Sequence, residues 1–240
     1  MKKRIAVCGN GWNNEFLKVG MNGIQECARE NNVDIFVFLN YSFDEGVGYK
    51  NVGEANIFHL LDYAKVDGII LLANSFHLPE EYEYLTERIM KMQIPAVSLE
   101  YRMKDIDYMG SDNYSGMYDM CKHLTDVHGV QKVVYVSGPK GNEESDIRRK
   151  ALEDVLWEKG LKLEESYVIY GNWSFLEVRK ELLLWLQSHT ELPDAFVCAN
   201  DVMAQGVCAS LKEKGIRVPE DVKVTGYDHL VSGIRHNPKI

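Results

Sequence analysis

The sequence predicts an α/β protein made of two similar lobes, each a doubly wound parallel sheet, with a ligand cleft between them. Short apolar stretches rich in β-branched residues alternate with longer helical patterns throughout the 240 residues. Such alternation is typical of right-handed βαβ units and a mostly parallel sheet. A faint internal repeat, in which the surroundings of Asp67 return at Asp194, indicates two sheets rather than one. The length is sufficient for two medium-sized domains with cores of their own.

The individual elements follow from the same patterns. The strand candidates are short runs of Val, Ile, Leu, Phe or Tyr, at residues 4–8, 34–39, 68–73, 96–100, 132–137, 167–170, 195–199 and 222–227. Helical periodicity is found at 16–31, 114–128, 146–159, 176–188 and 201–214. Two of these helices end in a cation followed by glycine, Lys159-Gly160 and Lys214-Gly215, which is the pattern of a glycine C-cap.

The internal repeat sets the expected domain boundaries. Asp67 opens the run Asp-Gly-Ile-Ile-Leu-Leu-Ala-Asn, and Asp194 opens Asp-Ala-Phe-Val-Cys-Ala-Asn. We expect a first lobe at residues 1–108 and a second at 109–235. Residues 236–240 are expected to begin a crossover back to the first lobe, whose final elements would follow residue 240.

Composition narrows the class of partner. Asp and Glu number 36 against 27 Lys and Arg, a net charge of -9, which disfavours direct contact with nucleic acid. No apolar stretch is long enough for a membrane span, and Gly9 interrupts the apolar run near the N-terminus before it reaches the length of a signal peptide. The five cysteines are odd in number and lack a CxxC spacing. Free thiols and a cytoplasmic location are therefore expected.

The residues of the expected cleft follow from the positions at which the predicted strands end. In open parallel sheets, ligands bind outside the carboxyl ends of the strands. Side chains just beyond these ends are rich in amides, carboxylates and indoles and poor in nucleophile–base pairs. They include Trp12, Asn13, Asn14, Phe16, Ser75, Glu100, Tyr101, Asn172, Trp173, Asn200, Asp201 and Asp228. Such a lining favours binding of a small polar molecule over catalysis.

Three motifs in the second half carry a family resemblance. They are Asn-Asp-Val-Met-Ala at 200–204, Val-Pro-Glu-Asp-Val at 218–222 and Thr-Gly-Tyr-Asp at 225–228. Together they resemble the effector-binding domain of LacI-type regulators, which shares the periplasmic binding protein-like I fold of sugar-binding proteins. The resemblance implies ligand contacts at Asn14, Phe16, Glu100, Arg148, Trp173, Asn200 and Asp228, to which the strand ends add Trp12. An Arg fork and carboxylates suit hydroxyls, and an indole suits a sugar face or a flat base.

Each of these residues has an ordinary structural alternative. Asn200 could cap the helix that begins at Asp201, and Asp228 could serve as a cap or hinge. Trp173 could belong to the core. Arg148 could be a surface residue beside Arg149. In Ser111-Asp112-Asn113, we expect a crossover turn rather than a ligand contact.

Catalytic, cofactor and metal sites are not expected. Gly9-Asn10-Gly11 begins like a dinucleotide fingerprint, but Asn14 stands at the third glycine. No HExxH, Cys/His cluster or GxSxG occurs. His123 and His128 are five residues apart on a predicted helix, so we expect them on different faces.

The function expected from these features is a sensor for a sugar-like or nucleoside-like molecule. Lobe closure would regulate an attached output domain, such as a GGDEF diguanylate cyclase, because no helix-turn-helix precedes the first predicted strand. One alternative is the effector-binding domain of a LacI-type DNA-binding transcription regulator. A second alternative is an enzyme on a similar α/β scaffold. The resemblance is also compatible with a homodimer that pairs through the first lobe.

Overall fold

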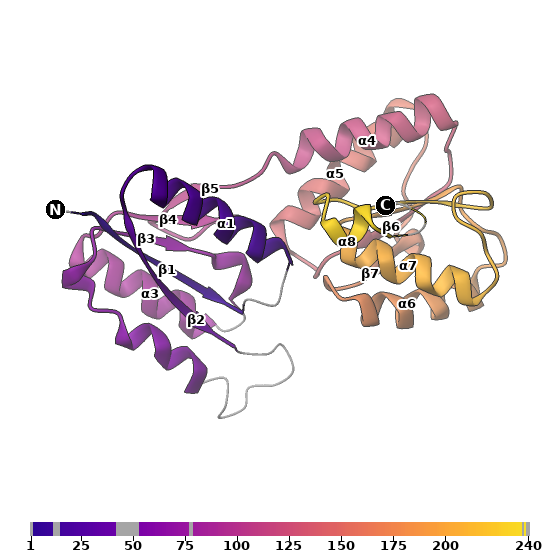
Figure 1. Cartoon of the computed structure of the whole chain (residues 1–240). Helices are drawn as coiled ribbons and strands as arrows, with labels where there is room; N and C mark the ends of the chain where they lie inside the picture. The colour runs from indigo at the N-terminus through magenta and orange to yellow at the C-terminus, as the bar shows by residue number, and fades with distance from the viewer. Residues whose placement is uncertain (1, 12–14, 42–52, 77–78, 237, 239–240) are drawn as a thin grey trace. The chain divides into compact units, whose positions relative to one another are not determined.

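The computed structural model describes residues 2–11, 15–41, 53–76, 79–236 and 238, and the chain divides into two compact units (Figure 1). Unit 1 is Met1–Ser111 and unit 2 is Asp112–Ile240. The predicted site residues Trp12 and Asn14 lie outside the described residues. None of the helices in the described ranges is long and apolar enough to cross a membrane.

Unit 1 is a parallel sheet with the strand order β2-β1-β3-β4-β5. The strands are β1 (Arg4–Asn10), β2 (Asp34–Asn40), β3 (Gly68–Leu71), β4 (Ala96–Leu99) and β5 (Asp107–Met109). Alternate side chains of β1 enter separate cores. Ala6 and Cys8 pack against α3 (Pro79–Met92) and the short helices η1 (Asn56–Leu60) and η2 (Tyr63–Lys65), whereas Val7 packs against α1 (Glu15–Glu30).

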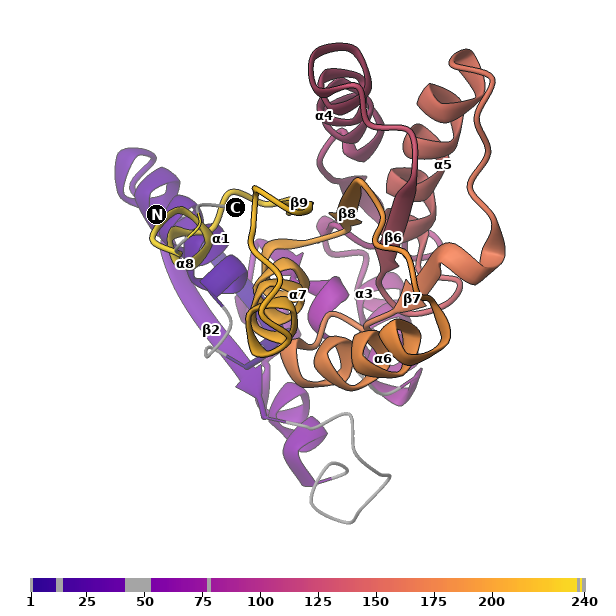
Figure 2. The same ribbon diagram turned by 90° about the vertical axis from the view of Figure 1, so that its right-hand side faces the viewer.

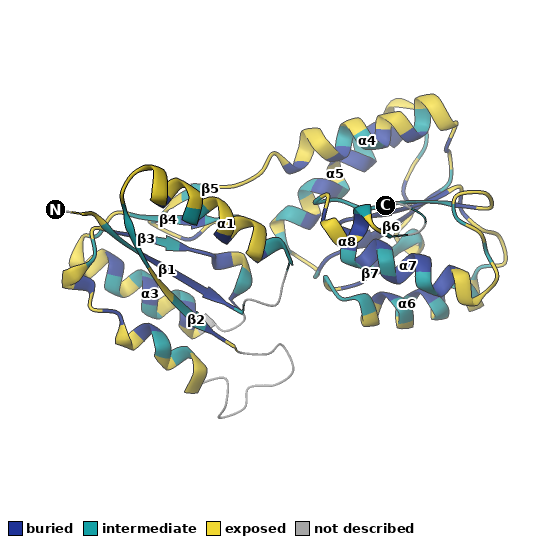
Figure 3. Cartoon of the chain, viewed as in Figure 1, coloured by how far each residue is buried: buried dark blue, intermediate teal, exposed yellow. Residues whose placement is uncertain are grey.

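Unit 2 is a parallel sheet with the strand order β7-β6-β8-β9. Its strands are β6 (Val133–Ser137), β7 (Val168–Tyr170), β8 (Ala195–Cys198) and β9 (Lys223–Thr225). Figure 2 shows α4 (Asn113–His128) and α5 (Glu143–Glu158) together on one side of this sheet. On the other side are α6 (Phe175–Ser188) and α7 (Asp201–Glu213). Every residue of β6 and β8 is buried, as the dark blue of β6 in Figure 3 indicates, because helices cover both faces.

The repeat seen in the sequence corresponds to a hydrogen-bonded contact of an Asp carboxylate that is found in both units. In unit 1 the Asp67 carboxylate accepts a hydrogen bond from the Arg4 backbone N–H at 2.8 Å. In unit 2 the Asp194 carboxylate accepts from the Gln131 and Lys132 N–H groups at 2.8 and 2.9 Å. Each Asp directly precedes one strand and binds N–H groups at or just before the start of the central strand beside it. The predicted α/β class with two similar parallel sheets is confirmed.

Some elements differ from the predicted ranges. Strand β5 is absent from the prediction, since it has only three residues. Helix α5 begins at Glu143, earlier than predicted, because the Asn142 side chain caps it by accepting from the Ser145 N–H at 3.0 Å. The predicted glycine C-caps are confirmed. Gly160 and Gly215 have φ of 70° and 73°, a left-handed conformation that glycine adopts without strain.

Candidate functional site in unit 2

The site begins with the way the first turn of α5 is attached to the end of β6. Ser145 is fully buried, and its Oγ accepts a hydrogen bond from the Gly138 N–H at 2.8 Å and lies 2.9 Å from Ser137 Oγ. The Tyr135 hydroxyl donates to the Ser145 carbonyl at 2.9 Å. These bonds fix the start of α5 against the carboxyl end of β6. Arg148, one turn further along α5, is thereby placed beside the strand ends.

Arg148 is a buried guanidinium at the centre of these ends, with a residue exposure of only 5%. Its Nε donates to Asn113 Oδ1 at 2.8 Å, and its Nη1 donates to the Ala199 carbonyl at 2.5 Å. Nη1 also lies 3.7 Å from Asp228 Oδ1. Within the described part of the chain, no hydrogen bond uses Nη2. Because a buried guanidinium seeks acceptors for all its N–H groups, Nη2 is suited to receive a ligand.

Two aromatic rings enclose the guanidinium. The Arg148 Cζ lies 3.9 Å from the centroid of the Tyr227 ring and 5.8 Å from that of Trp173. Both distances are within the range of cation–π attraction. A Cβ added at Gly138 would lie 2.4 Å from the Trp173 ring, so glycine at this strand end allows the indole to approach. The rings supply flat apolar surfaces next to a hydrogen-bond donor.

Positive φ values of non-glycine residues also occur at these strand ends. Asn172 and Trp173, directly after β7, have φ of 51° and 60°. Asp228 and His229, shortly after β9, have φ of 94° and 56°. Non-glycine residues rarely adopt such values, and when they do the strain is often associated with a functional site. Three predicted contacts have a positive φ: Trp173 and Asp228 at these strand ends, and Glu100, with a φ of 56°, after β4 in unit 1.

Asn200 caps helix α7, which is the structural alternative that the sequence analysis gave for this residue. Its Oδ1 accepts from the Met203 N–H at 2.9 Å and caps α7. No described hydrogen bond uses its Nδ2, so capping does not occupy the whole amide. The neighbouring Asp201 is buried and accepts from the Leu230 N–H at 2.7 Å. Asp201 thus stabilises the chain that follows β9.

The remaining predicted residues belong to unit 1. Phe16 lies in the first turn of α1 and packs, partly buried, against the core formed by Val7, Leu17, Met21 and Leu72. The Glu100 carboxylate accepts hydrogen bonds from the Ser111 N–H and, at 2.7 Å, from the Ser111 hydroxyl. Of the eight predicted contacts, the structure groups Arg148, Trp173 and Asp228 closely, with Asn200 adjacent to them through Ala199.

Two residues of the site were missed by sequence reasoning. Asn113, expected in a crossover turn, is the first residue of α4, and its side chain binds Arg148. Tyr227 covers the guanidinium with its ring. Its position beside Asp228 in the Thr-Gly-Tyr-Asp motif was an available signal. For Asn113 the only signal was a helix-start pattern, which predicts a cap and not a tertiary contact.

The groups that meet at the site are a charged hydrogen-bond donor and two aromatic rings, which suit non-covalent binding. The Ser137 hydroxyl pairs with that of Ser145 and not with a base. Across the described residues, no group of three or more His, Cys, Asp or Glu side chains is arranged to hold a metal ion.

One expectation about histidines is wrong. His123 and His128 lie on the same side of α4, with Nε2 atoms 3.2 Å apart, because His128 ends the helix before Gly129, which has a φ of 65°.

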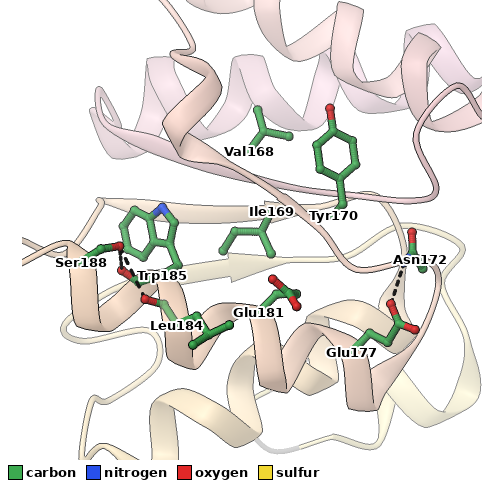
Figure 4. Close-up of a pocket in the computed structure, with 9 residues that line it drawn as sticks. All are labelled: Val168, Ile169, Tyr170, Asn172, Glu177, Glu181, Leu184, Trp185 and Ser188. Carbon is green, nitrogen blue, oxygen red and sulfur yellow. Dashed lines mark hydrogen bonds between the residues drawn. The ribbon is translucent and has the colours of Figure 1, made fainter.

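A separate pocket of about 510 Å3 lies along the edge strand β7 and helix α6. Figure 4 shows its apolar wall, which includes Ile169, Leu184 and Trp185, and two acidic side chains, Glu177 and Glu181. Glu177 accepts a hydrogen bond from Asn172 at 2.6 Å. None of the eight predicted contacts lines this pocket. We place the candidate site at Arg148, because among the described residues a buried donor, aromatic rings and backbone strain coincide there.

Comparison with known proteins finds similarity to one family model and to curated repressors. Residues 122–238 match the family model described as periplasmic binding protein-like domain. The HTH-type transcriptional repressor PurR of Haemophilus influenzae (strain PittEE) is 29% identical over 176 residues, covering 73% of this chain and 51% of the repressor. The chain thus spans about half the length of such relatives.

Solved structures show the same fold. A LacI family transcriptional regulator from Mycobacterium smegmatis matches with a TM-score of 0.80 and 19% identity, covering 98% of this chain and 82% of that one. A complex of the transcriptional regulator CelR with cellobiose also matches with a TM-score of 0.80, at 21% identity, covering all of this chain and 72% of that one. At these identities the likeness establishes the fold.

Proposed function

Because residues 122–238 match the family model of a periplasmic binding protein-like domain and the chain shares its fold with a LacI family regulator, we propose that it is an effector-binding domain that senses a small polar molecule. The ligand binds at the strand ends of unit 2, against Arg148, Trp173, Tyr227 and Asp228. Its class is sugar-like or nucleoside-like. It presents a hydrogen-bond acceptor to Arg148 and a flat face to the aromatic rings.

The observation that carries this proposal is the state of the Arg148 guanidinium. It is buried, two of its nitrogens are held by protein acceptors, and Nη2 has none among the described contacts. A charged donor in such a position gives both affinity and specificity, because a molecule without an acceptor would leave it unpaired. Phosphate, carbonyl and hydroxyl oxygens all satisfy this requirement.

The relatives support a regulator of transcription over a sensor with an enzymatic output domain. The PurR relatives are named as transcriptional repressors, and the matching solved structures include several transcription regulators. We therefore favour the alternative given in the sequence analysis, the effector-binding domain of a LacI-type transcription regulator. A cytoplasmic location, pairing with a second copy and a signal carried by lobe closure belong to the same proposal.

The test is a thermal-shift screen of the full chain with ribose, cellobiose, adenosine and hypoxanthine. A compound that binds only the folded state raises the melting temperature by mass action. Arg148→Met removes the donors but keeps an apolar stem. Arg149→Met is the matched control, since Arg149 is the next residue of α5 and pairs instead with Glu153 and Glu165.

We expect at least one of the four compounds to stabilise the wild-type chain and the Arg149→Met control. The same compound should fail to stabilise Arg148→Met. An equal shift in Arg148→Met would show that binding does not depend on this guanidinium. Turnover of any of the compounds would contradict a binding domain.

A further inference from the structure

Asn113 lies at the start of unit 2. It is the first residue of α4 and the second residue of unit 2. The preceding residue, Asp112, caps the helix by accepting from the Ser115 N–H at 3.0 Å, so the cap does not require the Asn113 side chain. Although it lies in a helix start, Asn113 is only 4% exposed. Its side chain is turned inward, to Arg148.

The contacts of Arg148 determine the direction in which its remaining donors point. A guanidinium is planar and rigid, so holding Nε on Asn113 and Nη1 on the Ala199 carbonyl sets the orientation of Nη2. Among the described residues, the Asn113 amide is the one side chain that accepts a hydrogen bond from Arg148. The Asp228 carboxylate, at 3.7 Å, is beyond good hydrogen-bond distance.

A second tie joins the same residues. The Tyr227 ring lies on the guanidinium, and its hydroxyl donates to the Asp112 carbonyl at 3.3 Å. The first turn of α4 is therefore linked to the ligand site twice, once through a side-chain amide and once through an aromatic residue. Both links meet at Arg148.

We propose that Asn113 is a positioning residue, which orients the Arg148 guanidinium for the ligand and couples ligand occupancy to the first turn of α4. This inference rests on the proposed function, because it gives that site its regulation. A ligand acceptor on Nη2 restrains the guanidinium further and so strengthens its hydrogen bond to Asn113 and its cation–π contact with Tyr227. The stabilised turn directly follows the boundary between the two units, at Ser111 and Asp112. A regulatory signal that travels along the chain from one unit to the other crosses this point.

The test compares three variants of the full chain. Asn113→Ala removes the acceptor, and Asn113→Asp keeps an acceptor oxygen at the same place. Tyr114→Phe is the matched control, because Tyr114 is the next residue of α4 and its hydroxyl contacts Asp154 on α5, not Arg148. Two readouts are needed: the NMR signal of the Arg148 Nε–H in the ligand-free chain, and the affinity for cellobiose and adenosine.

In the wild type, in Tyr114→Phe and in Asn113→Asp we expect a distinct, slowly exchanging Nε–H signal. In Asn113→Ala this signal should broaden or move to the range of exposed arginines. The affinity for whichever of the two compounds binds should fall roughly 10-fold to 100-fold in Asn113→Ala, as expected for a lost hydrogen bond to a charged group. Asn113→Asp should recover most of this loss.

The outcomes separate this inference from the proposed function. If the Nε–H signal of Asn113→Ala is unchanged, Asn113 does not position Arg148 and the inference is wrong, whatever binds. If the signal changes but the affinity does not, the amide has only a structural role and the inference is equally wrong. If Arg148→Met binds both compounds like the wild type, it is the proposed function that fails.

Discussion

The two units use the same framework and differ in what they place at the ends of their strands. In unit 2 the ends surround Arg148, whose Nη2 has no described protein acceptor. In unit 1, Asn40 ends β2 and Glu81 lies in the first turn of α3. They are 0% and 1% exposed and are hydrogen-bonded to each other through the amide nitrogen and a carboxylate oxygen. Unit 2 keeps a donor that we propose meets a ligand, whereas unit 1 joins a buried carboxylate to a buried amide of its own.

This difference shows which features the repeat preserves. Both sheets have the same order in their first four strands, and both use an Asp, at 67 and at 194, to receive N–H groups from the residues before or at the start of a central strand. These features build the fold. The chemistry at the strand ends is not repeated, because it comes from side chains on loops and helix starts. Recognition can therefore change in one unit without loss of the framework.

The largest effect on unit 1 is expected from Asn40→Leu. The amide is the described donor to the buried Glu81 carboxylate, and a buried charge that loses a donor is costly. We expect a loss of about 2 kcal/mol in the free energy of unfolding, measured by chemical denaturation. Asn31→Leu is the control, since Asn31 is exposed and bonds only to Cys27. A loss no greater than that of the control would mean that Asn40 does not stabilise Glu81.

A smaller loss of stability is expected when either of the repeated aspartates, Asp67 or Asp194, is replaced. Asp194→Ala removes two backbone hydrogen bonds and Asp67→Ala removes one. The denaturation midpoint should therefore fall further for Asp194→Ala than for Asp67→Ala. The reverse order would show that the two ties are not equivalent parts of a repeated framework.

The smallest expected effect is a dependence of the melting temperature on pH through the Asp67 carboxylate. The Arg4 N–H and, to a lesser extent, Lys3 hold the pKa of Asp67 below its usual range. A lowered folded-state pKa contributes stability above the unfolded pKa, and this contribution is lost as the pH falls through the folded pKa. The difference in melting temperature between wild type and Asp67→Ala should be present at pH 7 and narrow below about pH 4. A constant difference between pH 7 and pH 3 would contradict this role for the carboxylate.

Much of the fold could be predicted from the sequence because it depends on local patterns. Apolar runs revealed every strand except β5, which has three residues and a burial pattern with no buried position. The Lys-Gly pairs marked two helix ends. Helix α5 was placed late because its start depends on the Asn142 cap.

The site was predictable only in part. Arg148, Trp173 and Asp228 were named from strand ends and from motif register, and the structure groups them within unit 2. Asn113 was missed because its contact with Arg148 joins residues 35 positions apart, and one sequence carries no signal of such a pairing. Tyr227 was missed because an aromatic residue after a strand is equally typical of the core.

The central claim is that unit 2 binds its ligand at Arg148, and a crystal structure of the full chain with a compound identified by the thermal-shift screen tests it most directly. We predict electron density for the compound with an oxygen or nitrogen acceptor within hydrogen-bond distance of Arg148 Nη2 and with a face against Trp173. Density in the pocket between β7 and α6, with the contacts of Arg148 unchanged, would contradict the claim.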